Sequence, residues 1–415
     1  MRQGLVGDRP PPGSSRPERS PPLGPHRAPR PTAGEESSHM IRNALPLVLL
    51  LAGVATAAET PADRKCYDAA ARWLVTQQHD NGGFGELRGQ KGEVGITAIV
   101  AKALANAPER LRQELAPALG KATDFLVGTQ QKDGSFVLGR AGIPAYRTSV
   151  VIMALCAVDK KKYADAIKQG VAYLKGAQLD EAEGFKSDDV RYGGFSYGPV
   201  KAGGRGGPSA DLSNTAMALA ALHEAGVAKD DPVFKRAMTF LRRCQNNSET
   251  NDGAGFTPKD DGGFVYNPAA GGKQAPDSYA GMTYAGLLSL VYAGASPEDP
   301  AVRAATSWIS QNYTLQENRG LGARGSRHGK QAGLYYYFFS FAKCLQHLGQ
   351  PQLKTAKGEQ RWARDLFDVL RARQREDGSF KNADKTWWEG NPVLATAYCL
   401  NAMNHARPHL GEGQK

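Results

Sequence analysis

Two kinds of apolar segment alternate along the chain between residues 62 and 408. The first kind interleaves apolar residues with lysine and arginine at helical spacing, which predicts amphipathic helices with one buried face. The second kind is apolar on nearly every side and rich in alanine, serine and threonine, which predicts buried helices that pack closely. The segments of this second kind are 95–104, 148–155, 213–222, 282–290, 334–348 and 394–403. Six such pairs predict an inner ring of buried helices inside an outer, amphipathic ring.

A glutamine closes most of the amphipathic segments, and a phenylalanine follows it after a glycine turn. Such internal repetition is typical of folds built from one repeated unit. The five clear copies pair Gln78 with Phe84, Gln130 with Phe136, Gln178 with Phe195, Gln245 with Phe264, and Gln374 with Phe380. A degenerate sixth copy holds Trp308 and Gln311. We interpret these residues as structural.

The connections between the segments are unequal in length. Links that follow a buried segment are short, as at 159–162 and 294–299, whereas links that precede one are long, as at 179–210, 247–277 and 313–331. Alternate connections in a ring lie on opposite faces. The long loops are therefore expected on one face, together with the N-termini of the buried helices, and long loops are where function tends to reside.

The Leu-x-x-x-Gln pattern with its Gly-Gly-Phe turn resembles the glutamine–aromatic repeat of squalene and oxidosqualene cyclases. The same fold occurs in the β subunits of protein prenyltransferases. The resemblance implies an all-α (α/α)6 toroid of six helix pairs over residues 58–415, in which the repeats tie outer helices together. The closing aromatic residue is phenylalanine here, whereas the family usually has tryptophan.

The catalytic motif of the bacterial squalene cyclases is not intact. Their Asp-x-Asp-Asp-Thr-Ala motif matches residues 211–216, where Ser213 stands at the position of the proton donor. A serine hydroxyl is too weak an acid to protonate an alkene. Asp211 remains as a candidate catalytic acid, or as the N-cap of the third buried helix.

The zinc-binding motif of the prenyltransferases is not intact either. Their zinc-binding Asp-x-x-His-Thr stretch matches residues 277–283, which contain no histidine, so we predict no metal and no cofactor. Asp277 is the second candidate catalytic carboxylate. Glu93 and Glu389 also stand near the starts of buried helices, where carboxylates either perform acid–base chemistry or cap the helix.

Two groups of residues are candidates for ligand binding. A basic, glycine-rich loop before the fifth buried helix suits an anion, although a solvated loop is the alternative. Aromatic residues on and beside that helix suit an apolar or cationic ligand, with plain packing as the alternative. The candidates are Arg205, Arg324, Arg327, His328 and Lys330 for the anion, Tyr279, Tyr284, Tyr335 and Phe338 for the apolar ligand, and Ser213 and Asn214 at the altered motif.

The N-terminal region predicts export. Residues 1–39 are rich in proline and arginine and lack a hydrophobic period, which predicts disorder. Met40 opens a charged start, an apolar run over 44–54 and a small-residue site ending at Ala57, as in a secretory signal peptide. We therefore predict that residues 1–39 lie upstream of the true start, that 40–57 is a signal peptide, and that the protein is secreted or periplasmic. A disordered tail before a membrane anchor is the alternative.

The composition argues against several classes of protein. Glycine makes up 48 of 415 residues, about 12% against a usual ~7%, which fits the many turns of the repeats. The formal net charge of +11 is not evidence for nucleic acid, and no nucleic-acid-binding motif occurs. Five widely spaced cysteines argue against a disulfide scaffold or a zinc cluster. No membrane span is expected after signal cleavage.

Three functions remain open from the sequence. The preferred one is an exported, squalene-cyclase-like toroid without cyclase activity, which binds an apolar, isoprenoid or anionic ligand, or a protein partner, at its long-loop face. The second is an active isoprenoid cyclase or transferase that uses Asp211 or Asp277 as its acid. The third is a carbohydrate-active (α/α)6 enzyme, either a glycosidase or a polysaccharide lyase.

Overall fold

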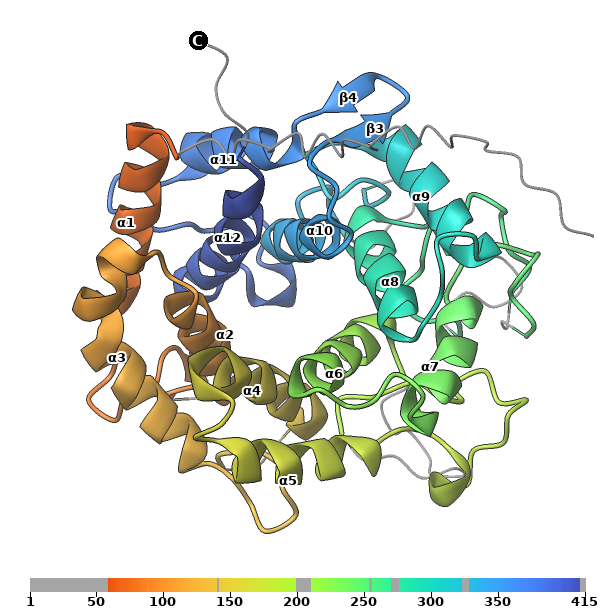
Figure 1. Cartoon of the computed structure of the whole chain (residues 1–415), viewed down its shortest axis with the longest axis horizontal. Coiled ribbons are helices and arrows are strands. Elements are labelled where there is room, and N and C mark those ends of the chain that lie inside the picture. The colour runs from red at the N-terminus through yellow and green to blue at the C-terminus, as the bar shows by residue number, and fades with distance from the viewer. Residues whose placement is uncertain are drawn as a thin grey trace, which may run out of the picture. The chain divides into compact units, whose positions relative to one another are not determined.

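In the residues that the computed structural model describes, twelve α-helices alternate between an inner and an outer ring (Figure 1). The inner helices are α2 (Val94–Ala105), α4 (Pro144–Asp159), α6 (Leu212–Ala225), α8 (Ala280–Tyr292), α10 (Leu334–His347) and α12 (Pro392–Ala406). The outer helices are α1 (Pro61–Thr76), α3 (Glu109–Val127), α5 (Ala164–Lys175), α7 (Pro232–Arg243), α9 (Pro300–Asn312) and α11 (Trp362–Arg373). Each inner helix contacts the next, and α12 contacts α2, so the inner ring is closed. The predicted all-α toroid of six helix pairs is confirmed.

The structure describes residues 59–87, 89–139, 142–198, 210–253, 256–269, 276–322 and 328–410. The segments 1–39 and 40–57 and the candidate residues Arg205, Arg324 and Arg327 lie outside these ranges. Two short antiparallel hairpins accompany the helices. They pair β1 (Glu86–Leu87) with β2 (Gln90–Lys91), and β3 (Leu353–Thr355) with β4 (Gly358–Gln360). Within the described ranges no helix is both long and apolar enough to cross a membrane.

The repeated glutamines bind consecutive outer helices to one another. Each follows one outer helix and donates its side-chain N–H to a backbone carbonyl near the start or middle of another, at 2.8–2.9 Å. The acceptors are Ala118 in α3, Ala166 in α5, Val233 in α7, Ala301 in α9 and Cys66 in α1. The last of these bonds, from Gln374, joins α11 to α1 and closes the outer ring. Each of these glutamines therefore makes a structural contact between two outer helices.

The repeated phenylalanines join each turn to the inner ring. All five side chains are fully buried. Their backbone N–H groups donate to threonine hydroxyls on the inner helices at 2.8–3.1 Å. The acceptors are Thr97, Thr148, Thr215, Thr283 and Thr396. Each repeat thus makes one hydrogen bond to an outer helix through its glutamine and one to an inner helix through a threonine.

The degenerate sixth repeat uses other contacts. Gln311 bonds only to Ser307 of its own helix among the described residues. Instead, the Tyr313 hydroxyl at the end of α9 donates to Asp365 of α11 at 2.7 Å, and the Ala356 N–H of the β3–β4 hairpin donates to the Ser310 carbonyl of α9 at 3.0 Å. The α9–α11 junction is therefore held by a tyrosine and a hairpin in place of the glutamine.

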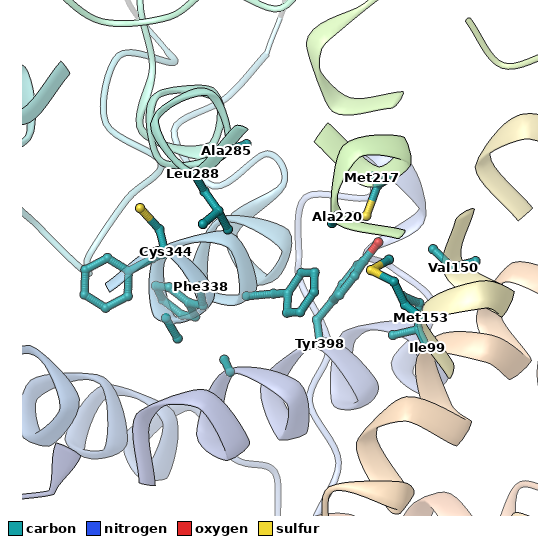
Figure 2. Packing of buried hydrophobic residues seen from close by; sticks show 14 of the residues in the cluster. Ile99, Val150, Met153, Met217, Ala220, Ala285, Leu288, Phe338, Cys344 and Tyr398 are labelled. Atoms are coloured by element: carbon teal, nitrogen blue, oxygen red, sulfur yellow. The ribbon is translucent and has the colours of Figure 1, made fainter. Parts of the chain in front are cut away.

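The interior of the ring is filled mainly by apolar side chains, and Figure 2 shows examples from all six inner helices. At the C-terminal ends of these helices lies an ion triad whose two lysines are buried and whose glutamate keeps 21% of its side-chain exposure. Glu224 of α6 accepts from Lys102 of α2 at 2.7 Å and from Lys343 of α10 at 2.8 Å. These are the first, third and fifth inner helices, so the triad connects helices that are not neighbours in the ring.

Candidate functional site

A cavity of about 790 Å³ lies among the N-terminal ends of the inner helices. This volume falls within the roughly 300–1,000 Å³ that is usual for small-molecule sites. Residues from the first two turns of all six inner helices line it, as do loop residues near β1 and β2. The prediction that the long-loop face carries the candidate site agrees with this position. The ion triad lies at the opposite end of the same helices.

Tyrosines form much of the polar surface of the cavity. They are Tyr146, Tyr197, Tyr266, Tyr279, Tyr336 and Tyr398. The hydroxyls of Tyr146 and Tyr398 lie 3.3 Å apart, and those of Tyr197 and Tyr266 lie 3.1 Å apart. Burial raises the pKa of all six hydroxyls above its ordinary value. The cavity therefore presents neutral phenols, which donate hydrogen bonds through O–H and offer aromatic faces to a ligand.

Two adjacent tryptophans stand where the cavity opens to solvent. Trp387 and Trp388 both line the cavity, yet they retain 40% and 50% of their exposure. Both have positive φ angles, 52° and 69°, in a region that bulky residues rarely occupy. Trp387 packs against Gly333, where an added Cβ would come within 2.7 Å of its ring. Trp387 and Trp388 are strained and exposed at the cavity mouth, so they are candidates for ligand contact.

Asp211 lies behind the cavity wall. It caps α6 by accepting from the Asn214 N–H at 2.9 Å, and it also accepts from the Ser213 hydroxyl at 2.7 Å and the Asn214 amide at 2.6 Å. Burial raises the pKa of Asp211, although these donors oppose the shift. Ser213 lines the cavity in front of this carboxyl, so the ligand space meets a hydroxyl at this point.

Glu93 and Arg147 form a buried ion pair in the cavity wall. The Glu93 carboxylate caps α2 through the Ile96 N–H at 2.7 Å and accepts from Arg147 Nε at 2.7 Å. Arg147 is only 4% exposed, and its Nη1 has no hydrogen-bond partner among the described residues. Glu93 is the only acidic residue, and Arg147 the only lysine or arginine, among the described residues that line the cavity.

Three of the four candidate carboxylates cap inner helices, which is one of the two roles expected of them. Glu93 and Asp211 cap their own helices, whereas Glu389 caps α10 by accepting from the N–H groups of Tyr335 and Tyr336 at 3.1 and 2.7 Å. Burial raises the pKa of Glu389 to about 7, against these donated bonds. Asp277 is 57% exposed and pairs with Lys259, so it neither caps α8 nor lines the cavity. The structure therefore does not bring Asp277 together with Asp211.

The aromatic candidates divide between the cavity and the core. Tyr279 lines the cavity as expected. Tyr284, Tyr335 and Phe338 do not; their rings pack against other buried aromatic rings, with Tyr284 5.1 Å from Phe341 and Tyr335 6.0 Å from Phe380. On α10 it is Tyr336 that faces the cavity. The expectation is corrected because the rotation of the helix, about 100° per residue, turns Tyr336 inward and Tyr335 away.

The remaining ligand candidates lie mostly outside the cavity wall. Asn214 is buried, and its side-chain amide donates a hydrogen bond to Asp211. Lys330 is exposed and pairs with Glu317 at 3.3 Å. The His328 ring lies 4.7 Å from the ring of Trp387, at the cavity mouth. Sequence reasoning missed the tryptophan pair and the Arg147 pairing with Glu93, although a double tryptophan in a loop was a visible signal.

Family models match most of the ring. The model of the squalene-hopene cyclase C-terminal domain matches residues 90–266. The model of the prenyltransferase alpha-alpha toroid domain matches residues 259–409. No curated protein sequence matches the chain.

Solved structures of similar fold include enzymes of different chemistry. The type II terpene cyclase MstE from Scytonema is 14% identical, with 84% of this chain and 99% of that chain covered and a TM-score of 0.51. A variant of the same cyclase in complex with merosterolic acid A is 15% identical, covers 84% and 98%, and has a TM-score of 0.52. The alpha-1,6-mannanase GH76A of Salegentibacter sp. HEL1_6 is 11% identical, covers 84% and 99%, and has a TM-score of 0.54. At these identities the likeness shows the fold alone.

Proposed function

We propose a function that starts from the membership of this chain in the superfamily of terpenoid cyclase and prenyltransferase toroids. In this proposal the cavity binds an apolar, isoprenoid-like ligand and does not cyclise it. The cavity combines a suitable volume with aromatic and aliphatic walls. Apolar walls that carry a few placed polar groups are the usual composition of small-molecule sites.

The main support for this proposal is the position of the carboxyl groups of Asp211 and Glu93 relative to the cavity. Alkene protonation needs a strong acid whose proton faces the double bond. In this chain Ser213 stands between Asp211 and the ligand space, and both oxygens of Asp211 accept hydrogen bonds from protein donors. Both oxygens of Glu93 already accept hydrogen bonds, from Arg147 and from the Ile96 N–H. Neither carboxyl is arranged to deliver a proton to an alkene.

The direct test of the proposal combines binding with product analysis. Geranylgeraniol added to the full chain should quench or shift tryptophan fluorescence, because Trp387 and Trp388 line the cavity mouth. A variant with both tryptophans replaced by phenylalanine should retain binding by native mass spectrometry while losing most of that optical change. Prolonged incubation with squalene and isoprenyl diphosphates should return them unchanged. Absence of binding would refute the proposal, and a cyclised product would establish the alternative of an active cyclase that uses Asp211.

One observation favours a carbohydrate ligand as a second candidate. Exposed, adjacent tryptophans such as Trp387 and Trp388 are suited to stacking on sugar rings. Glycoside hydrolysis additionally needs two carboxylates about 5–10 Å apart across the bond. In the described residues the cavity wall offers only Glu93, which is already paired. Saturable binding of α-1,6-mannotriose in place of geranylgeraniol would favour this candidate.

We also propose that the protein is exported by the segment from Met40 to Ala57. The charged start, apolar run and small-residue site support this proposal. Expression of the full coding sequence should give an extracytoplasmic product that begins near Ala58, as read by N-terminal sequencing. Met40→Leu should abolish export if translation starts at this methionine. Recovery of a cytoplasmic chain that retains residues 1–57 would contradict the proposal.

A further inference from the structure

We propose that the cavity recognises its apolar ligand through a carboxylate head group, which binds the Arg147 guanidinium. This inference rests on the proposed function, because it assigns the ligand class of the same cavity. It concerns the end of the cavity between α2 and α4, where Arg147 and Glu93 lie in the wall.

The hydrogen bonding of Arg147 is incomplete. A guanidinium carries five N–H donors in a planar fork. In the described part of the chain, this one uses Nε for Glu93, and its buried Nη1 donates to nothing. A buried donor without a partner is destabilising, because it has given up its hydrogen bonds to water. Arg147 is more than nine-tenths buried and lines the ligand space, so a carboxylate that reaches Nη1 from the cavity would supply the missing acceptor.

Glu93 does not occupy all the hydrogen-bond donors of Arg147. Its Oε1 accepts from Arg147, while its Oε2 accepts from the Ile96 N–H as the cap of α2. The carboxylate therefore holds the guanidinium in place from one side. Arginine binds carboxylates through two parallel N–H donors when its fork is free. The donors not directed at Glu93 are the ones available for a second carboxylate.

The electrostatic setting favours a single negative charge. Glu93 and Arg147 cancel each other, and the remaining field comes from the inner helices, whose N-terminal turns line the cavity. A helix N-terminus carries roughly half a positive charge, which favours an anion in the cavity. A diphosphate would bring several charges to a wall whose described lining contains a single cation.

The rest of the wall selects the body of the ligand. The aliphatic lining residues include Leu87, Val94, Ile96, Met217, Met282 and Leu394. Burial of an apolar chain against them is favourable because it removes apolar surface from water. The geometry thus specifies an amphiphile with an acidic head and an isoprenoid-like tail.

The test compares two ligands that differ only at the head. Geranylgeranoic acid and geranylgeraniol are titrated against the full chain at pH 8, with tryptophan fluorescence and native mass spectrometry as readouts. The acid should bind at least tenfold more tightly, equivalent to about 1.4 kcal/mol. Glu93→Gln should increase this acid-to-alcohol ratio, because it removes the one negative charge beside the head group.

Substitution of the arginine needs a matched partner change. Arg147→Met leaves Glu93 buried without its cation, so the double variant E93Q/R147Q, which keeps two neutral hydrogen-bonding side chains, is measured beside it. The ratio should fall to about one in every folded variant that lacks Arg147. A ratio of about one in the wild type, or an unchanged ratio in E93Q/R147Q, would overturn the inference alone. Failure of both ligands to bind the wild type would overturn the proposed function with it.

Discussion

Replacing Glu224 with alanine should lower the free energy of unfolding by about 3–5 kcal/mol, the usual penalty for removing one partner of a buried ion pair. Lys102 and Lys343 keep only 6% and 9% of their side-chain exposure, and Glu224 is the described anion that both contact. Without it, two buried ammonium groups repel each other inside the ring. Urea unfolding followed by circular dichroism measures the loss.

Two control variants separate this effect from general damage. Glu114→Ala removes a mostly exposed ion pair with Arg72 and should cost less than about 1 kcal/mol. The triple replacement of Lys102, Glu224 and Lys343 by methionine removes the charges together and should recover much of the stability. If E224A proves no more harmful than E114A, the triad is not a major contributor to stability.

Acid titration provides an independent measurement of the same triad. Burial alone would raise the pKa of Glu224, but the charges of Lys102 and Lys343 hold it at about 2. Its ordinary value is 4.5. A carboxyl whose pKa is lower in the folded state contributes stability above its unfolded pKa and loses it as pH falls. The loss from wild type between about pH 4.5 and 2 should therefore reach about 3 kcal/mol, and Glu224→Gln should lack this component.

Gly193→Ala is the second substitution with a large expected effect, a loss of at least about 3 kcal/mol. Gly193 has a φ of +80°, where a side chain is strained. An added Cβ would lie 1.9 Å from the Arg236 carbonyl oxygen in α7, far inside contact distance. The backbone of the turn or of α7 must then move, and the Gln178 bond to Val233 in α7 would be disturbed.

Gly89 offers a matched control for this substitution. Its φ of +81° is nearly the same, but an added Cβ would meet nothing within 4 Å. Gly89→Ala should therefore show only the conformational penalty, about 1–2 kcal/mol. The difference between the two melting curves isolates the close approach of the turn to α7. Equal losses in the two variants would show that the close approach is unimportant.

The same close approach recurs around the ring. Four other repeat glycines have positive φ, and their added Cβ would lie 2.3–2.8 Å from a carbonyl oxygen of a neighbouring outer helix. They are Gly82, Gly134, Gly262 and Gly378. Glycine, glutamine and phenylalanine therefore recur together because each makes a contact that every junction needs. That is why the fold could be predicted from sequence spacing: each unit of such a ring contacts mainly its neighbours.

The candidate site was less predictable because its residues lie on uniformly apolar helices. An amphipathic helix reveals its buried face through its polar one, but α10 has six aromatic residues among its first eight and no clear polar side there. The sequence therefore could not distinguish Tyr336, which faces the cavity, from Tyr335, which packs against Phe380. The rotation of α10 depends on its contacts with α8 and α12.

Charged residues inside apolar segments were hidden for a related reason. Arg147 lies 54 residues from Glu93, and Glu224 lies 122 residues from Lys102 and 119 from Lys343. Each appears as an isolated charge along the chain. Only the folded ring shows that each has a partner, and that Arg147 still has a donor without an acceptor.

The sequence by itself determined the order of the twelve helices, the ring, the ties between outer helices and the face that carries the cavity, because these follow from periodic contacts between neighbouring repeats. The tertiary structure decided which side chains enter the cavity, that Ser213 separates Asp211 from it, and that Arg147 and the Trp387–Trp388 pair belong to its wall. These outcomes depend on helix rotation and on contacts across the ring. Neither is encoded in local spacing, since both arise only when all six inner helices pack together.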